Sequence, residues 1–420
     1  MIKIYKMDQW MLIKKSTICS FILPSVILCT VIVLHNLNKS NSFTSITQKQ
    51  SLTEHNQSAI YQVTNDNSQH VIDANEEKAC DLFVGKWIRD FKESNYNNWT
   101  CPTLPTLKNC LKHGKDSDYI YWRWKPDNCE LPRFDPSMFL RAVQRKKLAF
   151  IGDSLARNQM ESLLCLLSQL ETPVNKHRDA DDKFQTWYFP SHDFTLMVMW
   201  TEFLVVGNER IVNGTASNAF DIHLDKVNGN WSDKLAGIHY AIISSGNWFF
   251  RTNYLYKGGY LIGCIYCRDS NLTDYGPVYA IKNALSTSLG FISKCKECEE
   301  MVTVLRTYTP SHFEHGSWFD GGYCNRTQPL SESEVMSLNG RHAWRIRESQ
   351  VEEFGKIVQS VEKKKKKFVL LDVSKAMMLR ADGHPGSHWP RVRDVSDCLH
   401  WCLPGPVDLW NELLMVILNK

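Results

Sequence analysis

The stretch from Lys146 to Leu167 constrains the fold more than any other part of the chain. It opens with an apolar run, Leu148–Ile151, which is bounded by lysines and is typical of a buried strand, and it continues with leucines at helical spacing. Ser154 is therefore predicted to lie at a strand-to-helix turn, where Gly152 lets the chain turn tightly. Because a helix N-terminus carries unpaired N–H groups and positive potential, this position suits a serine beside a developing oxyanion.

The Gly152-Asp153-Ser154 motif is a weak signal alone, because Asp at a helix start is more often only an N-cap. The C-terminal part of the chain adds a second signal, since Asp397 precedes His400 by three residues. That spacing can place both side chains on one loop, where the carboxylate orients the imidazole that deprotonates a serine. We therefore predict a triad with Ser154 as nucleophile, His400 as general base and Asp397 as the orienting carboxylate.

The rest of the chain alternates between strand-like and helix-like segments. We expect strands within 184–206 and at 238–245, 301–305 and 368–373, and helices at 277–292, 351–361 and 407–418. This alternation predicts an α/β fold with a mostly parallel sheet flanked by helices. Gly246 and Asn247 follow one of the strands, and sites assemble where such strands end.

Together these motifs resemble the plant trichome birefringence-like family of polysaccharide O-acetyltransferases, whose fold is similar to that of SGNH/GDSL hydrolases. The resemblance runs from about Cys80 to Leu418 and includes three further motifs: Arg306-Thr307-Tyr308-Thr309-Pro310-Ser311-His312-Phe313, Gly321-Gly322-Tyr323-Cys324 and Asp382-Gly383-His384-Pro385-Gly386. It implies an SGNH-like domain that transfers acetyl groups to a plant cell-wall polysaccharide in the Golgi through an acetyl-serine at Ser154. It also implies an acetyl donor, either acetyl-CoA or an acetylated carrier supplied by a Golgi protein, and no bound cofactor.

The resemblance extends to residues around the nucleophile. Arg157 and Asn158 match the family's Asp-Ser-x-x-Arg-Asn pattern, which implies donor or substrate contact, although a buried salt bridge is an equal alternative for Arg157. Gly246 and Asn247 occupy the place of the Gly and Asn block of SGNH enzymes. Many family members carry His at the position of Asn247, so oxyanion donor and structural cap both stay open for its side chain. Gly152 and Asp153 complete the candidate oxyanion and substrate set.

The acceptor is the open question of this interpretation. The segment Gly263–Cys267 looks like the family branch that includes xyloglucan and mannan acetyltransferases, so we rank xyloglucan first, then mannan, with xylan or pectin after them. A triad cannot distinguish water from a sugar hydroxyl as acceptor. An SGNH-type acetyl esterase is therefore the first alternative, and a noncatalytic wall-polysaccharide binding protein is the second.

Fourteen cysteines are many for an intracellular enzyme, and twelve of them follow residue 79, which favours an oxidising lumen. Spacing alone does not fix their connectivity. The family resemblance suggests the pairs Cys80–Cys129, Cys101–Cys165, Cys110–Cys402 and Cys324–Cys398.

Two cysteine pairs and three histidines raise the possibility of a metal site. Cys264/Cys267 and Cys295/Cys298 have zinc-ribbon-like spacing, but in an oxidising compartment we favour two further disulfides over a zinc site. His312, His384 and His388 lack tight ligand spacing, so we expect no metal there.

The N-terminus predicts a membrane anchor. Residues 16–34 carry no charge and are about as long as the ~20 residues that cross a bilayer. The lysines before this segment predict a cytosolic N-terminus, and a cleaved signal peptide is the competing interpretation. We expect a cytosolic tail at 1–15, a signal anchor at 16–35, a flexible stem at 36–78 and a luminal catalytic domain at 79–420. That domain would comprise a cysteine-rich segment, 79–145, and a core, 146–420, in a single-pass type II Golgi membrane protein.

Surface features agree with a luminal enzyme. Candidate glycosylation sequons begin at Asn56, Asn98, Asn213, Asn230, Asn271 and Asn325. The formal charge is only +4, and the run Lys363–Lys367 is typical of a solvated turn, so we expect no nucleic-acid partner. For the tryptophans of the cysteine-rich segment we favour packing over carbohydrate stacking: Trp87, Trp99, Trp122 and Trp124.

Overall fold

The computed structural model describes residues 80–337, 340–361, 366–389 and 395–420, all within the compact unit Ala74–Lys420. The predicted tail, anchor and stem, the sequon at Asn56 and most of the run Lys363–Lys367 lie outside the described residues. In the described part of the chain, no helix combines the length and apolar character that a membrane span requires.

Within the described residues, the main sheet has seven strands in the order β13-β12-β9-β3-β6-β5-β4. Its members are β3 (Lys147–Gly152), β4 (Val174–Arg178), β5 (Phe184–Phe189), β6 (Phe194–Trp200), β9 (Tyr240–Ile243), β12 (Val302–Arg306) and β13 (Lys367–Leu371). The strands from β13 to β6 run parallel, whereas β5 and β4 add an antiparallel edge. The prediction of an α/β domain with a mostly parallel sheet is confirmed.

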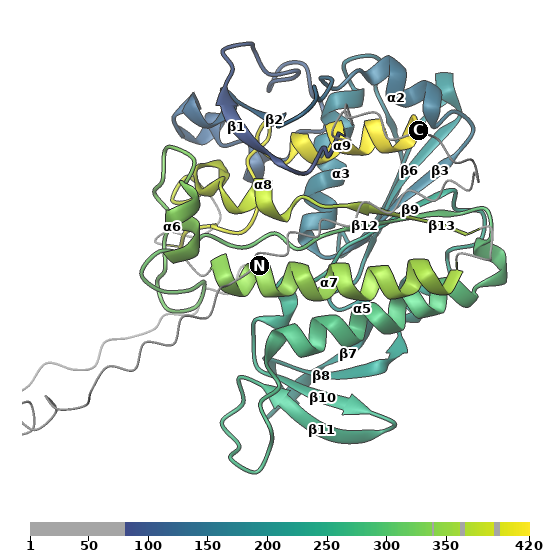
Figure 1. Cartoon of the computed structure of the whole chain (residues 1–420), viewed down its shortest axis with the longest axis vertical. Helices are drawn as coiled ribbons and strands as arrows, with labels where there is room; N and C mark the ends of the chain where they lie inside the picture. The colour runs from purple at the N-terminus through teal and green to yellow at the C-terminus, as the bar shows by residue number, and fades with distance from the viewer. Residues whose placement is uncertain (1–79, 338–339, 362–365, 390–394) are drawn as a thin grey trace, which may run out of the picture. The chain divides into compact units, whose positions relative to one another are not determined.

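Helices cover both faces of this sheet (Figure 1). One face packs against α2 (Pro136–Ala142), α3 (Ser154–Leu167) and α9 (Asp408–Leu418), and the other against α4 (Gly229–Ser232), α5 (Gly276–Lys294) and α7 (Gly340–Val361). Strand β3 shows why. Leu148 and Phe150 point into the first core, and Ala149 and Ile151 point into the second. A strand that is apolar at every position is therefore buried on both sides.

A second sheet, which the sequence did not predict, packs on the far side of α5. Its order is β11-β10-β8-β7, with β7 (Val205–Val212), β8 (Thr215–Val227), β10 (Asn253–Lys257) and β11 (Tyr260–Ile265). Figure 1 shows α5 between this sheet and α7. One face of the sheet, including Phe220 and Leu255, contacts Ala280 and Ala284 of α5. Because the other face is largely exposed, the strands are polar at many positions and give a weak strand pattern.

The cysteine-rich segment forms an antiparallel pair, β1 (Gly85–Arg89) and β2 (Trp122–Pro126), joined through short 3₁₀ helices. Trp87 and Trp124 meet edge to face at 5.7 Å. The Trp87 indole N–H donates to the carbonyl of Ala376 in α8 (Ser374–Met378), and the Trp124 indole donates to Leu82. These two tryptophans therefore pack the segment onto the core, whereas Trp99 is 90% exposed. The remaining helix, α6 (Glu332–Ser337), precedes α7.

Six disulfides join cysteines of the described residues. The four pairs suggested by the family resemblance are among them, and the two Cys-x-x-Cys motifs form the others: Cys80–Cys129, Cys101–Cys165, Cys110–Cys402, Cys324–Cys398, Cys264–Cys267 and Cys295–Cys298. In the described residues, no group of three or more His, Cys, Asp or Glu side chains could hold a metal ion.

Candidate active site

Ser154 is the first residue of α3 and directly follows the carboxyl end of β3. Asp153 is the N-cap, because its Oδ1 accepts the Leu155 N–H at 3.0 Å. Gly152 has a φ of 156°, and a Cβ at this position would lie 2.2 Å from the carbonyl oxygen of Ser244. Only glycine fits that approach, so the sharp turn that presents Ser154 depends on it.

His400 and Asp397 lie on the loop before α9 and form a hydrogen-bonded pair. His400 Nδ1 lies 2.8 Å from Asp397 Oδ2, and Asp397 Oδ1 accepts the main-chain N–H groups of Leu399 and His400. Burial alone would raise the pKa of Asp397, but the positive charge of His400 and these hydrogen bonds hold it well below its usual range. Because Nδ1 faces the carboxylate, Nε2 is the nitrogen left for proton transfer.

Asn158 joins the base loop to the nucleophile helix. It lies one turn after Ser154, and its Oδ1 accepts the Trp401 N–H at 2.8 Å while its Nδ2 donates to the Trp401 carbonyl at 3.3 Å. His400 is also close enough to Asp153 for its charge to act on that carboxyl group. The two distant motifs are therefore brought to one place.

The loop that carries His400 is also held by two disulfides and by main-chain hydrogen bonds. Cys398 and Cys402 are bridged to Cys324 and Cys110, respectively. Asp397 exchanges two main-chain hydrogen bonds with Gly386, and the Cys402 N–H donates to the carbonyl of Gly383. The segment 382–386, which carries one of the motifs of the resemblance, therefore supports the main chain around His400.

Arg306 is a functional neighbour that sequence reasoning missed. It is 2% exposed, its charge acts on Asp153, and its guanidinium lies 4.3 Å from the centre of the Trp410 ring. Burial raises the pKa of Asp153, and the charge of Arg306 opposes that rise. Burial lowers the pKa of Arg306 itself to about 10, so it stays charged at neutral pH. The available signal was that a buried aspartate beside a nucleophile needs a cationic partner.

Gly246 and Asn247 follow β9, which is adjacent to β3 in the sheet. A Cβ on Gly246, whose φ is 156°, would lie 2.6 Å from the ring of Tyr308. Asn247 Nδ2 lies 3.5 Å from the Thr309 carbonyl, which is a long contact, while its main-chain N–H faces the Asp153 carboxyl group. Gln350 of α7 fixes this loop by donating to the Ser245 carbonyl and accepting the Tyr308 N–H.

The other residues expected to contact substrate have different surroundings. Arg157 donates to the carbonyl of Asp182 at 2.8 Å and forms longer ion pairs with Asp182 and Glu161, which agrees with the salt-bridge alternative. Asn158 is fully buried, and both ends of its amide bond the main chain of Trp401, so in this structure it holds the loop. Asp153 is the N-cap of α3, because its carboxylate accepts the Leu155 N–H.

Aromatic side chains lie beside the nucleophile. Trp200, at the end of β6, is in register with Gly152, and its ring meets that of Trp248 edge to face at 6.2 Å. The guanidinium of Arg251 lies 4.0 Å from the centre of the Trp248 ring, and its Nε is buried without a hydrogen-bond partner. Trp200 and Trp248 are only partly buried, so they offer aromatic surface next to Ser154.

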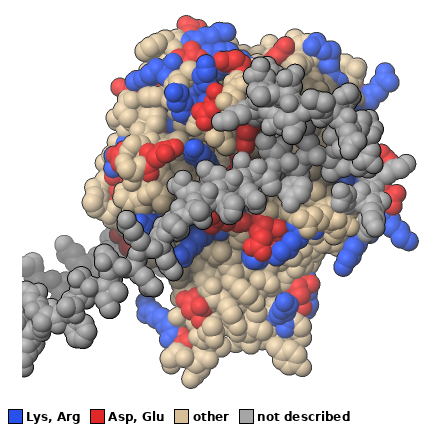
Figure 2. Space-filling view, viewed as in Figure 1, with Lys and Arg blue, Asp and Glu red and all other residues tan. Residues whose placement is uncertain are grey.

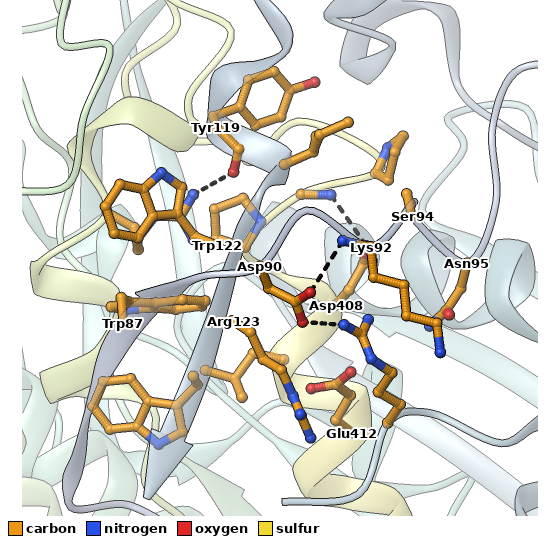
Figure 3. Close-up of a pocket in the computed structure, with 18 of the residues that line it drawn as sticks. Trp87, Asp90, Lys92, Ser94, Asn95, Tyr119, Trp122, Arg123, Asp408 and Glu412 are labelled. Atoms are coloured by element: carbon orange, nitrogen blue, oxygen red, sulfur yellow. Dashed lines mark hydrogen bonds and ion pairs between the residues drawn. The ribbon is translucent and has the colours of Figure 1, made fainter.

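A separate pocket lies between the β1–β2 segment and α9 (Figure 3). Its wall includes Trp122, and an ion pair between Asp90 and Arg133 crosses it. Glu412 and Asp408 of α9 also line it. The pocket includes none of the three predicted triad residues, so it is not the site of the proposed chemistry.

Comparison with known proteins places these observations in a family context. The GDSL/SGNH-like acyl-esterase family found in Pmr5 and Cas1p matches residues 131–417, and the PMR5 N-terminal domain matches residues 78–130. The chain is 49% identical to xyloglucan O-acetyltransferase 4 of Populus trichocarpa over 348 residues, 82% of each chain. It is 46% identical to xyloglucan O-acetyltransferase 2 of Arabidopsis thaliana over 346 residues, 81% of this chain and 83% of the relative. It is 39% identical to protein trichome birefringence-like 25 of Arabidopsis thaliana over 361 residues, 82% of this chain and 78% of the relative.

Proposed function

Because the chain belongs to the GDSL/SGNH-like acyl-esterase family found in Pmr5 and Cas1p, we propose that it is an O-acetyltransferase that acetylates hydroxyl groups of xyloglucan. The observation that carries the proposal is the hydrogen-bonded pair of His400 and Asp397, on a loop that Asn158 ties to the helix of Ser154. The choice of acceptor rests on the relatives named xyloglucan O-acetyltransferases, with 46–49% identity.

In the first half-reaction, Ser154 Oγ attacks the carbonyl carbon of the acetyl donor, and its proton passes to His400 Nε2. The tetrahedral intermediate collapses when the bond to the leaving group breaks, and the leaving group takes the proton from Nε2. The products are acetyl-Ser154 and the protonated leaving group. Asp397 stabilises the imidazolium that forms between these steps, because its carboxylate stays ionised.

In the second half-reaction, a sugar hydroxyl transfers its proton to His400 Nε2 while its oxygen attacks the acetyl carbon. The bond from that carbon to Ser154 Oγ then breaks, and Oγ takes the proton back. Both half-reactions place negative charge on the acetyl oxygen. We assign its stabilisation to the Ser154 N–H at the start of α3 and to the loop at Gly246 and Asn247.

The same proposal assigns acceptor contact to the aromatic surface of Trp200 and Trp248. Sugar rings present C–H faces that stack on aromatic side chains. Trp200 is in register with Gly152, beside the turn that carries Ser154, and its ring contacts that of Trp248. A neutral polysaccharide also fits the charge of the protein, since acidic and basic side chains are interspersed on the face shown in Figure 2. The chemistry of this surface does not separate xyloglucan from mannan or xylan, which remain the alternative acceptors.

The proposal includes the setting predicted from the sequence. Six disulfides within the described residues suit an oxidising lumen, which supports a type II Golgi membrane protein anchored by 16–35. The acetyl donor is acetyl-CoA or an acetylated carrier.

The test is to incubate the purified full chain with a generic acetyl ester, 4-nitrophenyl acetate, and a panel of deacetylated xyloglucan, mannan and xylan oligosaccharides, and to locate new acetyl groups by NMR. We expect acetyl on xyloglucan oligosaccharides and none with the Ser154→Ala variant. Release of free acetate without transfer to any sugar would replace the proposal with an esterase. No turnover with acetyl ester or with acetyl-CoA, by a folded protein, would support a noncatalytic binding role.

A further inference from the structure

Two buried histidines form a hydrogen-bonded chain that ends at the catalytic base loop. His384 Nδ1 lies 2.7 Å from the main-chain carbonyl oxygen of His400, and His384 Nε2 lies 2.7 Å from His312 Nδ1. At the other end, His312 Nε2 lies 2.9 Å from the carbonyl oxygen of Met378. His384 also stacks on Trp401, with 4.1 Å between ring centres. Each histidine is thus fixed by contacts at both ring nitrogens.

The two ends of this chain determine where protons must be. A carbonyl oxygen only accepts, so His384 Nδ1 and His312 Nε2 must both carry hydrogen. A neutral imidazole has one N–H and one lone pair, so the two inner nitrogens would then face each other as lone pairs at 2.7 Å. That contact is repulsive, and it becomes a hydrogen bond only if one more proton lies between them.

The surroundings limit the pair to one added proton. Burial lowers the pKa of His312 to about 4 and lowers that of His384 well below its usual range, and charge on His312 lowers the pKa of His384 further. Two charged rings are therefore excluded, and a single added proton is held against burial by the 2.7 Å contact between the inner nitrogens. The groups that act on the pair are Asp382, Glu314, Asp397 and Lys115. The carboxylates of Asp382, Glu314 and Asp397 favour a single positive charge shared by the two histidines. Each carboxylate also forms an ion pair: Asp382 with Arg380, Glu314 with Arg326, and Asp397 with His400.

We propose that His312 and His384 are positioning residues that share one added proton, and that this proton keeps the main chain at His400 fixed. The inference rests on the proposed function for the role of His400 as base. If the shared proton is lost, one of the two carbonyls must lose its donor. Since His384 Nδ1 donates to the His400 carbonyl in only one of the two hydrogen-bonded neutral arrangements, rising pH loosens the base loop, and kcat falls on the alkaline side while KM for the acceptor is unchanged.

The first test observes the protons directly in the active, full-length protein. Nitrogen-15 histidine NMR at about pH 6.5, the ordinary histidine pKa, should show three N–H groups on the two rings and a strongly deshielded inner proton. Assignment uses the His384→Asn and His312→Gln variants. A spectrum in which each ring has one protonated and one bare nitrogen would overturn the shared proton, whatever the outcome for the proposed function.

The second test uses substitutions that separate hydrogen bonding from titration. In His384→Asn the Nδ2 amide replaces Nδ1 as donor to His400, so we expect kcat to stay within about fivefold of the wild type and its alkaline decline to disappear. His384→Leu removes the donor to the His400 carbonyl. The resulting displacement of His400 should lower kcat by roughly 100-fold.

The matched control is His388→Leu. His388 lies four residues further along and bonds the His113 carbonyl rather than the base loop, so neither kcat nor the pH profile should change. Equal activity of folded His384→Leu and wild type would refute the positioning role. An unchanged alkaline decline in His384→Asn would refute the titration.

Discussion

Asn158 and Trp401 are joined by two hydrogen bonds, with the Asn158 Oδ1 accepting the Trp401 N–H at 2.8 Å and Nδ2 donating to the Trp401 carbonyl at 3.3 Å. One residue lies on the helix that Ser154 begins, and the other follows His400. A single amide side chain therefore sets the spacing between the nucleophile helix and the base loop.

Asn158→Leu should preserve the fold and lower kcat by roughly 100-fold, because a displacement of about 1 Å at the base is enough for such a loss. The acceptor KM should change little, since Asn158 is fully buried. Steady-state kinetics and thermal unfolding would check this. Gln169→Leu is the control. The Gln169 amide donates to the Cys165 carbonyl near the C-terminal end of α3, away from Ser154. Equal losses in both variants would argue against a specific role for Asn158.

Asp397→Asn should lower kcat by about 10³–10⁴-fold with little change in secondary structure, because an amide can hold the wrong histidine tautomer. The carboxylate is ionised in the native state with a pKa below its usual range. Its stabilising effect is therefore present above the unfolded pKa and is lost as pH falls through the native pKa. Activity within tenfold of wild type would contradict the orienting role.

Cys402→Ser should lose activity before it loses secondary structure. The bridge to Cys110 spans 292 residues and ties the base loop to the cysteine-rich segment. Its loss should cost roughly 2–4 kcal/mol of unfolding free energy. Activity and circular dichroism would be followed together during thermal unfolding. The double variant Cys295→Ser/Cys298→Ser removes a bridge of sequence separation 3 and should keep full activity.

Two partly buried carboxyl groups that line the pocket of Figure 3 predict how stability depends on pH. Burial raises the pKa of Glu412 to about 7 and that of Asp408 to about 6. Native pKa values above the unfolded ones mean that the folded state retains protons, so this contribution to stability is full at low pH and is lost as pH rises through 6–7. Glu412→Gln should raise the unfolding free energy at pH 8 by on the order of 1–2 kcal/mol. Chemical denaturation at pH 5 and 8 measures this; an equal effect at both pH values would contradict it.

Much of the central sheet was predictable because its strands are buried on both faces. The strand expected at 301–305 is β12, and the one at 368–373 overlaps β13, since parallel strands leave continuous apolar runs. Helix α7 begins at Gly340 rather than near 351, because charged residues obscure its apolar positions such as Ala343 and Ile346. The second sheet was missed since its exposed face dilutes the strand pattern.

The site was predictable only in part. Ser154, Asp397 and His400 stand in short local motifs, and the structure brings these motifs together. The support of the site was not predictable, because Arg306, Gln350 and His384 act through contacts between residues far apart in the sequence. His312 and His384, which the sequence raised as candidate metal ligands, instead contact main-chain carbonyl groups. Such roles follow from tertiary packing and leave no local spacing pattern.

The central claim is that Ser154 carries the acetyl group between donor and acceptor. The most direct measurement is mass spectrometry of peptides from the full chain, quenched after brief exposure to 4-nitrophenyl acetate without a sugar acceptor. We predict one added acetyl group on the peptide containing Ser154, its disappearance when xyloglucan oligosaccharides are added, and its absence in Ser154→Ala. Transfer to xyloglucan at the wild-type rate by Ser154→Ala, with no acetyl on the enzyme, would contradict the account.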